Sequence, residues 1–453
     1  MFKVSQIIKA TGGKLIQGNL QDELAGISTD SRSVKAQEAF LALSGNNFDG
    51  HDFIAAALEA KVGCLIVEKE PACPVSKDRA IIQVKNTTLA LGDIARFQRQ
   101  KFNLPVIAVT GSNGKTTSKE MIAWVLSGTA RVLKNEGTKN NAIGLPQTLI
   151  RLTPEDNFAV VEIGTNHFGE IDYLAKIAQP NIGLITNIAS SHLEFLKDLN
   201  GVLKEKSALL DNLQEPAIAV LCADDKLLKR VRVEKNKKRQ IFSFGIDEKS
   251  DFRAGAIRIG QEKVEFKVNR KFKFALPTIG YYNIYNALGA IAVGRILGLE
   301  YFAIAARLSD FKFPSGRLNL IQRKGLKFID DTYNSNPLSF RAALRALDAL
   351  ECKGKKILIM GDMRELGGQK ELLHRQIARS ITNSCDLLVT VGSLARLTAE
   401  AAEKCGFKKK NIFCCENSPE AREVLLKKIF PGRTDLILVK GSRSMKMEEV
   451  LKI

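Results

Sequence analysis

Short apolar runs alternate with helix-length segments along the first half of the chain. The runs fall at residues 40–43, 64–67, 106–109, 158–161, 182–185 and 217–221. Between the second and third runs, residues 87–102 show helical spacing. Apolar runs bounded by turns indicate buried strands, and strands that alternate with helices indicate βαβ units in a parallel sheet. We therefore expect an α/β protein.

Apolar residues recur at every second position between residues 251 and 276. They are Ile257, Ile259, Val264, Phe266 and Val268. This alternation is typical of half-buried strands, so we predict antiparallel hairpins added to the parallel sheet. A helix predicted over residues 284–297 follows them and closes this part of the chain.

Residues 311–317, which include Pro314 and Gly316, break both patterns and indicate a linker. The strand–helix alternation then restarts, with apolar runs at 327–329, 356–360, 387–391, 412–414 and 436–439. These runs predict a second, smaller, Rossmann-like sheet, although no GxGxxG motif supports a dinucleotide site. The expected fold is α/β with three domains, namely a small α/β domain at 1–84, a central domain at 85–314 and a C-terminal Rossmann-like domain at 315–453.

Composition narrows the class of protein. The 453 residues are 45% hydrophobic, which is enough for several cores, and their formal net charge of +19 suits an anionic partner. The densest basic runs, 226–239 and 408–410, contain no aromatic residues of the kind that stack on bases. We therefore expect no nucleic-acid partner.

Three features bear on the location of the protein. The eight cysteines include no CxxC pair, which favours reduced thiols. Polar residues interrupt the N-terminus, which therefore lacks the apolar core of a signal peptide. The longest apolar stretch, residues 287–299, is too short to cross a bilayer. We expect a cytoplasmic monomer without integral membrane association.

A glycine-rich loop follows the strand predicted at residues 106–109. A strand, such a loop and a helix in this order form a P-loop, in which glycines turn backbone amides toward phosphate oxygens and the helix N-terminus adds its dipole. The helix is expected to start near Ser118. We expect Lys115 to supply a positive charge and Thr116 to offer its hydroxyl to Mg²⁺. The ATP-binding residues expected in this loop are Gly111, Ser112, Asn113, Gly114, Lys115, Thr116 and Thr117.

Two polar segments that follow predicted strands add magnesium-type chemistry. Glu162 lies in VVEIGTN at residues 160–166, and His192 lies in TNIASSHLE at residues 186–194. The carboxyl ends of parallel strands meet at one edge of a sheet, so both side chains are expected near the P-loop. A carboxylate suits Mg²⁺, whereas a lone histidine is more often structural.

These motifs together resemble those of the Mur ligases, a family of ATP-dependent, amide-forming ligases of peptidoglycan precursor synthesis. The resemblance covers essentially the whole chain, and TGSNGKT at residues 110–116 is similar to the family's variant of the Walker motif. It implies ATP and Mg²⁺ as cofactors, a catalytic role for Lys115, His192 and Lys206, and a carbamate on that second lysine. The metal-site residues that it implies are Thr116, Glu162, His192 and Lys206.

The resemblance also implies ATP contacts outside the P-loop. Asn283 and Asn286 match the family's HNxxNxxAA motif, with Tyr282 in place of its histidine, and Cys222 stands where a related motif has asparagine. The arginine of a GR motif that approaches the ATP phosphates and the aspartate that holds the ribose correspond to Arg317 and Asp331. Taken alone, Arg317 would be interpreted as a surface arginine.

Three C-terminal segments resemble those of the family members that join D-alanyl-D-alanine to a UDP-N-acetylmuramoyl-tripeptide. They are DDTYNSNP at 330–337, GDMRELG at 361–367 and KGSRSMKME at 440–448. The resemblance implies that these two compounds are the substrates and that the C-terminal domain binds the dipeptide. The substrate-binding residues that it implies are Ser28, Asp30, Ser31, Arg32, Asn46, His51, Asn140, Asn141, Asn334 and Asn336.

Other functions stay open at this point. A sister ligase of the family, either the enzyme that adds the third residue or a folylpolyglutamate synthase, would share the ATP site but not the C-terminal segments. The charge would also suit a nucleic-acid-stimulated P-loop ATPase, and a regulatory nucleotide-binding protein would bind ATP without catalysis. The third residue of the tripeptide could be diaminopimelate, lysine or another residue.

Overall fold

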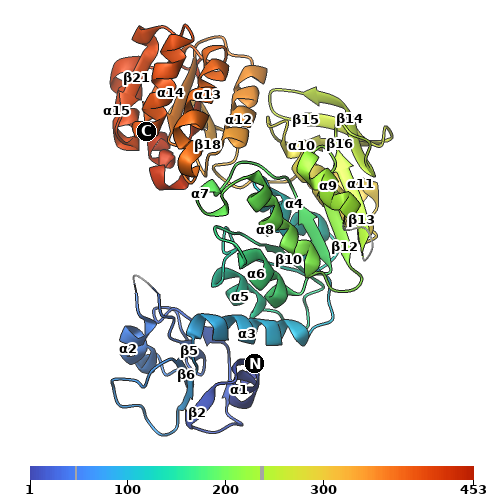
Figure 1. Ribbon diagram of the computed structural model, residues 1–453, viewed down its shortest axis with the longest axis vertical. Helices are drawn as coiled ribbons and strands as arrows, with labels where there is room; N and C mark the ends of the chain where they lie inside the picture. The colour runs from blue at the N-terminus through green and yellow to red at the C-terminus, as the bar shows by residue number, and fades with distance from the viewer. Residues whose placement is uncertain (46–47, 235–238) are drawn as a thin grey trace.

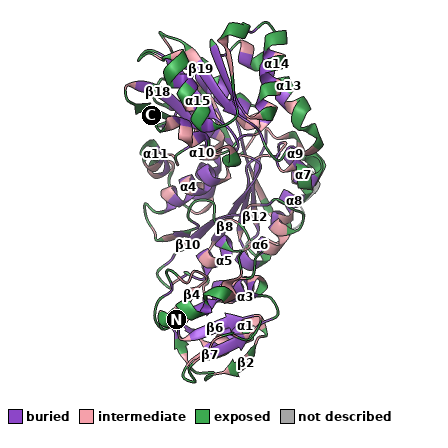
Figure 2. Ribbon diagram, turned by 90° about the vertical axis from the view of Figure 1, so that its left-hand side faces the viewer, coloured by how far each residue is buried: buried purple, intermediate pink, exposed green. Residues whose placement is uncertain are grey.

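The computed structural model describes residues 1–45, 48–234 and 239–453. Three large sheets follow one another along the chain, and helices flank each of them (Figure 1). Their strands are largely buried, whereas many helices are exposed on their outer faces (Figure 2). The α/β fold with three domains is therefore confirmed, and the individual domain boundaries stay predictions. Among the described residues, no helix combines the length and the apolar character that crossing a bilayer requires.

The N-terminal part contains a five-stranded sheet with strand order β2-β7-β6-β5-β4. Its strands are β2 (Lys14–Gln17), β4 (Ile27–Ser28), β5 (Ala39–Leu41), β6 (Cys64–Val67) and β7 (Ala80–Gln83). Strands β4 to β7 are parallel, and β2 is antiparallel to β7. The same part contains a short antiparallel strand pair, β1 (Phe2–Lys3) with β3 (Glu23–Leu24), and the helices α1 (Val4–Thr11), η1 (Gly50–Phe53) and α2 (Ile54–Glu59). Helix α3 (Thr87–Gln100) leads from this part to the central sheet, as its spacing predicted.

The central sheet has nine strands in the order β16-β15-β14-β13-β12-β11-β8-β10-β9. They are β8 (Val106–Thr110), β9 (Val132–Lys134), β10 (Phe158–Glu162), β11 (Ile182–Ile185), β12 (Ile218–Cys222), β13 (Gln240–Gly245), β14 (Phe252–Ile259), β15 (Val264–Val268) and β16 (Phe272–Leu276). Every residue of β8 and of β11 is buried, which explains their unbroken apolar runs. The helices are α4 (Lys115–Leu126), α5 (Gly144–Leu149), α6 (Glu170–Ala178), α7 (Leu193–Leu196), α8 (Leu199–Asp211), α9 (Lys226–Glu234), α10 (Asn283–Ile296) and α11 (Tyr301–Ser309).

The antiparallel hairpins predicted from alternation are present at β14, β15 and β16. Strand β15 alternates buried and half-buried residues as expected. Strand β14 differs, because its pairing with β15 shifts between Gly255 and Arg258, and Ile259 is 42% exposed. A bulge of this kind changes which face a side chain occupies, which sequence alternation does not reveal.

The C-terminal sheet has six strands in the order β17-β18-β22-β19-β20-β21. They are β17 (Asn319–Arg323), β18 (Leu326–Asp331), β19 (Lys356–Gly361), β20 (Leu387–Val391), β21 (Ile412–Cys415) and β22 (Leu436–Lys440), of which only β17 is antiparallel to its neighbour. The helices are α12 (Pro337–Ala349), η2 (Gly367–Gln369), α13 (Lys370–Thr382), α14 (Ser393–Lys404), η3 (Lys409–Asn411), α15 (Ser418–Val424), η4 (Leu425–Ile429), η5 (Arg443–Met445) and η6 (Met447–Leu451). The sequence did not predict β17, an edge strand whose residues are half-buried or exposed. Residues 310–318, which join this sheet to α11, form neither helix nor strand, as expected of a linker.

Candidate active site

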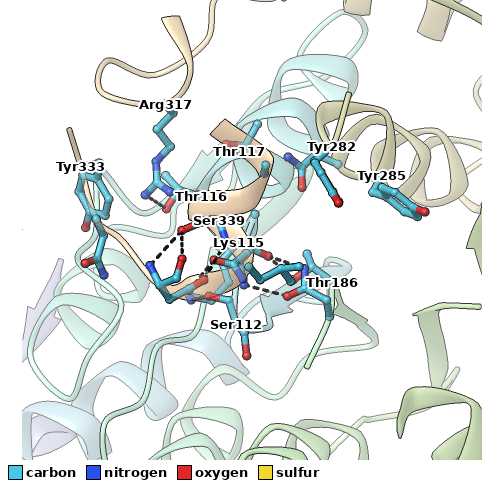
Figure 3. Close-up of a pocket in the computed structure, with 18 of the residues that line it drawn as sticks. Ser112, Lys115, Thr116, Thr117, Thr186, Tyr282, Tyr285, Arg317, Tyr333 and Ser339 are labelled. Atoms are coloured by element: carbon cyan, nitrogen blue, oxygen red, sulfur yellow. Dashed lines mark hydrogen bonds between the residues drawn. The ribbon is translucent and has the colours of Figure 1, made fainter. Parts of the chain in front are cut away.

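A cavity of about 420 Å³ lies where the carboxyl ends of β8, β10 and β11 face the C-terminal part. It is lined by most of the residues that the sequence marked as ATP or metal ligands (Figure 3). Gly111 and Lys206 are absent from the lining, and three residues with an expected substrate role, Asn140, Asn334 and Asn336, belong to it. The ATP or metal residues in the lining are Ser112, Asn113, Gly114, Lys115, Thr116, Thr117, Glu162, His192, Asn283, Asn286, Arg317 and Asp331. The structure therefore brings together residues that are more than 200 positions apart in the chain.

The P-loop connects β8 to α4, and its two glycines are required by close packing. Gly111 has φ 144°, and a Cβ there would lie 1.9 Å from Thr186 Oγ1. Gly114 has φ 82°, and a Cβ there would lie 2.2 Å from Asn286 Oδ1. The helix begins at Lys115, three residues earlier than expected, so the lysine belongs to its first turn. The expected start at Ser118 was wrong because glycine in a left-handed conformation ends the loop at position 114.

Lys115 is held within its own loop. Its Nζ donates to the carbonyl oxygens of Gly111 at 2.8 Å and Ser112 at 3.4 Å. Burial lowers the pKa of this lysine, although the nearby carboxylates of Glu162 and Glu365 oppose that shift. Weakly compensated positive charge at the mouth of a P-loop favours binding of an anion.

Glu162, the last residue of β10, presents a carboxylate with one free oxygen. Its Oε1 accepts a hydrogen bond of 2.7 Å from Asn140 Nδ2. Its Oε2 is buried and has no hydrogen-bond partner among the described residues. An unpaired buried carboxylate oxygen is costly and fits a position where a cation binds.

His192 lies before α7 with φ 53°, a left-handed conformation that is uncommon for a non-glycine residue. Its Nδ1 is 2.7 Å from Oε2 of Glu365, which belongs to the GDMRELG segment of the C-terminal part. Glu365 also has a positive φ of 63°. The imidazole of His192 lowers the pKa of this carboxyl. The sequence marked the segment but not this contact.

Lys206 on α8 is only 1% exposed. Within the described residues, its amine has no hydrogen bond or ion pair. Burial, followed by the charge of Lys115, lowers the pKa of Lys206 well below its usual value. Lys206 therefore faces away from solvent, although its charged neighbours in the sequence are typical of an exposed helix surface. A neutral amine at this place can react with CO₂ to give a carbamate.

The donor set fits Mg²⁺ only if that carbamate forms. The described residues contain no group of three or more His, Cys, Asp or Glu side chains that could hold a metal. Glu162 supplies one unpaired buried oxygen, and buried Lys206 has no hydrogen-bond or ion-pair partner in the part of the chain that the structure describes. Converting this amine to an anionic oxygen ligand would supply the missing charge, whereas an unmodified lysine would repel a cation.

Two side chains of the C-terminal part reach the P-loop. Arg317 Nη2 donates to Thr116 Oγ1 at 2.9 Å, and its guanidinium stacks 4.0 Å from the ring centre of Tyr333 (Figure 3). Asn336 Nδ2 donates to Asn113 Oδ1 at 2.7 Å. Planar stacking and hydrogen bonding orient a guanidinium for phosphate recognition.

Asp331 and Asn334 are connected by a lysine that the sequence did not single out. Lys440, 1% exposed, donates from Nζ to Asp331 Oδ2 at 2.5 Å and to the carbonyl oxygen of Asn334 at 2.9 Å. Burial raises the pKa of Asp331, and the charge of Lys440 opposes this shift. Lys440 is the first residue of the KGSRSMKME segment. The resemblance therefore indicated the importance of this segment, but not the contacts of Lys440 with Asp331 and Asn334.

Asn286, which pairs with Asn283 at the start of α10, lies beside the end of the P-loop and the first turn of α4. Asn286 Nδ2 donates to Asn283 Oδ1 at 2.9 Å, and Ser118 Oγ donates to Asn286 Oδ1 at 3.2 Å. Tyr282, which replaces the family's histidine, accepts a hydrogen bond of 3.2 Å from Arg345 of α12. Cys222 also lines the cavity, and burial raises the pKa of its thiol to about 12.

The other described residues with an expected substrate role lie outside the lining of this cavity. Ser28, Asp30, Ser31, Arg32 and His51 belong to the N-terminal part, and Asn46 lies outside the described residues. Arg32 pairs with Asp30 at 2.7 Å, and His51 places Nδ1 2.6 Å from Asp49 Oδ1 while Nε2 accepts from the backbone of Glu68. Asn141 accepts hydrogen bonds from the first turn of α5. Gln147 Nε2 donates to Thr29 Oγ1 at 2.6 Å, so α5 and the N-terminal loop are in contact.

Fold and site define an α/β protein in which a P-loop and a C-terminal sheet share one cavity. Three family profiles match the chain: "Mur ligase family, catalytic domain" at residues 23–99, "Mur ligase middle domain" at 109–294 and "Mur ligase, glutamate ligase domain" at 316–443. The chain belongs to the Mur ligase family.

Similar proteins are known over nearly the full length of the chain. An Escherichia coli protein named UDP-N-acetylmuramoyl-tripeptide--D-alanyl-D-alanine ligase is 36% identical over 99% of this chain and 97% of its own. A crystal structure of MurF from Acinetobacter baumannii has a TM-score of 0.90 at 33% identity and covers 100% of this chain and 98% of its own. A MurF ligase from Thermotoga maritima, crystallised with ADP, has a TM-score of 0.81 at 28% identity, with coverages of 94% and 96%.

Proposed function

We propose that the protein is an ATP-dependent ligase that joins D-alanyl-D-alanine to UDP-N-acetylmuramoyl-tripeptide. The products are the UDP-N-acetylmuramoyl-pentapeptide, ADP and phosphate. The full-length similarity to a ligase named for these substrates supports this choice over a sister ligase. The observation that carries the chemistry is the shared cavity, in which the P-loop, Glu162 and Arg317 meet.

The reaction proceeds in two steps. The free carboxylate of the tripeptide attacks the γ-phosphorus of ATP, the bond between the β and γ phosphates breaks, and ADP leaves. The amine of D-alanyl-D-alanine then attacks the acyl carbon of this acyl phosphate. The tetrahedral intermediate collapses as phosphate leaves, and the ammonium proton is lost to solvent. Activation is needed because a carboxylate has no good leaving group.

The residues of the chain have electrostatic and positioning roles in these steps. Lys115 and Arg317 stabilise negative charge on the γ-phosphoryl group as it is transferred. Thr116, Glu162, His192 and a carbamate on Lys206 would hold Mg²⁺, which when bound neutralises phosphate charge. Asn283 and Asn286 hold the start of α4 through their hydrogen bonds, and Asp331 holds the ribose.

The substrates are assigned to the three parts of the chain. Residues 1–84 bind the uridine nucleotide through the segments around Ser28 and His51, and residues 85–314 bind ATP and the acceptor carboxylate. The amide-rich loop that contains Asn140 and Asn141 meets the muramoyl-peptide. Residues 315–453 bind D-alanyl-D-alanine near Asn334 and Asn336. The protein acts as a monomer in the cytoplasm, where ATP is made.

The direct test measures phosphate release with ATP, Mg²⁺ and D-alanyl-D-alanine. Each candidate UDP-muramoyl-tripeptide, ending in diaminopimelate or lysine, is supplied in turn. We expect release only when both substrates are present, with formation of the pentapeptide detected by mass. Release that requires DNA or RNA would indicate the ATPase alternative, and ATP binding without any substrate-dependent release would indicate a regulatory protein.

A further inference from the structure

Lys119 is a buried cation that the reaction described above does not use. It lies one turn beyond the P-loop on α4 and is 0% exposed. Its Nζ donates to the carbonyl oxygens of Asn135 at 2.6 Å and Gly137 at 3.2 Å, and it lies 2.7 Å from Glu120 Oε1. These three partners match the three donors of an ammonium group. A buried charge is costly unless it is fully paired. The complete pairing of this lysine therefore indicates a structural role for its contacts.

Asn135 connects Lys119 to the end of β10. This asparagine is also 0% exposed. Its Oδ1 accepts from the backbone N–H of Glu162 at 2.9 Å, and its Nδ2 donates to the carbonyl oxygen of Glu162 at 3.1 Å. The same Nδ2 donates to the carbonyl oxygen of Lys139 at 2.9 Å. One amide therefore fixes both the strand residue and the loop that follows β9.

The loop itself then contacts the carboxylate. Asn140 Nδ2 donates to Glu162 Oε1 at 2.7 Å, and a Cβ at Gly164 would lie 2.7 Å from this asparagine side chain. The amide is thus held between the carboxylate and the backbone beyond β10. Its position depends on the path of residues 135–141, which Lys119 holds at two carbonyl oxygens.

We propose that Lys119 is a positioning residue that ties the P-loop helix to residues 135–141 and, through Asn135 and Asn140, orients the carboxylate of Glu162. Lys119 does not line the cavity, so it acts through these residues and not on a ligand. Helix α4 thereby carries both the P-loop and the anchor of the loop that we assign to the muramoyl-peptide. The kinetic part of this proposal rests on the proposed function.

Lys134 provides a matched control that separates the loss of a positive charge beside Glu120 from the loss of the hydrogen bonds to the loop. Lys134 also pairs with Glu120, but its side chain is 43% exposed and it makes no hydrogen bond to residues 135–141 among the described residues. Replacing either lysine by methionine removes one cation from the same carboxylate. Only the replacement of Lys119 removes the two hydrogen bonds to the loop.

The experiment compares the wild-type protein with Lys119→Met and Lys134→Met. Hydrogen–deuterium exchange needs no substrate, and we expect amides within 135–141 to exchange about tenfold faster in Lys119→Met, the effect of losing a buried charged hydrogen bond. In the ligation assay we expect kcat to fall about tenfold, because the carboxylate of Glu162 loses its orientation, and KM for the UDP-muramoyl-tripeptide to rise about tenfold, because the loop loses its anchor, while KM for ATP changes less than about twofold. Lys134→Met should resemble the wild type in both measurements.

A second variant keeps the test decisive if Lys119→Met does not fold. Asn135→Ser leaves the buried charge in place but shortens the connecting amide, and it should show the same faster exchange and the same selective rise in KM. A folded Lys119→Met with unchanged exchange in 135–141, or equal effects in Lys134→Met, would overturn the proposal. Absence of ligation by the wild-type protein would instead refute the proposed function, and exchange would still test Lys119.

Discussion

Lys206 shows how far burial can change the chemistry of one side chain. Its neighbours in the sequence, Lys204 and Glu205, suggest a charged helix surface, whereas Lys204 is exposed and Glu205 and Lys206 are buried. Glu205 turns inward to accept backbone hydrogen bonds from Gly169 and Ile171. The motif resemblance predicted the position of Lys206, but its burial and lowered pKa depend on how α8 packs, which short-range sequence patterns do not determine.

We expect Lys206→Ala to lose nearly all ligase activity, because the metal site then lacks one anionic ligand. Acetate should partly restore the rate by supplying a carboxylate to the vacated space, as measured by phosphate release at increasing acetate concentration. Lys206→Arg should be inactive with or without acetate, since arginine keeps its charge and cannot form a carbamate. Lys204→Ala is the control. Substantial activity of Lys206→Arg would contradict the role assigned to this lysine.

At the scale of elements, the loop between β19 and α13 is held by hydrogen bonds to neighbouring helices. Its Asp362 accepts a hydrogen bond of 2.8 Å from the first turn of α14, and the backbone N–H of Met363 donates to the buried ring of His374 at 2.9 Å. Gly367 has φ 56°, and a Cβ there would lie 3.1 Å from the backbone of Glu194. The loop therefore presents Glu365 to His192 in a fixed position. The sequence predicted that this segment belongs to the site. It did not predict that the segment contacts His192 and α7, which come much earlier in the chain.

Glu365→Gln is expected to lower kcat about tenfold to a hundredfold, because it weakens the partner of His192, the histidine that we propose as a metal ligand. The KM values for ATP and the tripeptide should change little, because the glutamine keeps the size of the side chain. In a His192→Ala background the same change should have no further effect, which a double-mutant cycle measures. Glu371→Gln, an exposed neighbour on α13, provides the control. Additive losses would show that the two side chains act separately.

At the scale of the whole molecule, the sequence predicted the three sheets and the motifs that face the cavity. Most predicted strand positions agree with the structure to within two residues, because parallel buried strands produce clear apolar runs. The contact between the C-terminal part and the P-loop could not be predicted from apolar runs. It depends on single contacts between distant residues, such as Arg317 with Thr116 and Asn336 with Asn113.

Arg317→Ala should reduce kcat about a hundredfold or more, since it removes a preorganised positive group from the transferred phosphoryl. Nucleotide binding to the central part should survive, because the P-loop itself is intact, and calorimetry with a non-hydrolysable ATP analogue measures this. Arg323→Ala on the exposed edge strand β17 serves as the control for loss of charge. A variant that keeps the wild-type rate would exclude Arg317 from the site.

Because two parts of the chain share the cavity, ATP bound to only one of them should be hydrolysed slowly. A nucleotide held by the P-loop alone would lack Arg317, which arrives with the C-terminal part across residues 310–318. The γ-phosphate would then face water without the full set of charges that assist its transfer. Given the role that we propose for Arg317, we expect this division of the cavity to limit futile hydrolysis, because ATP would then react at speed only when the segment that we assign to the second substrate is in place.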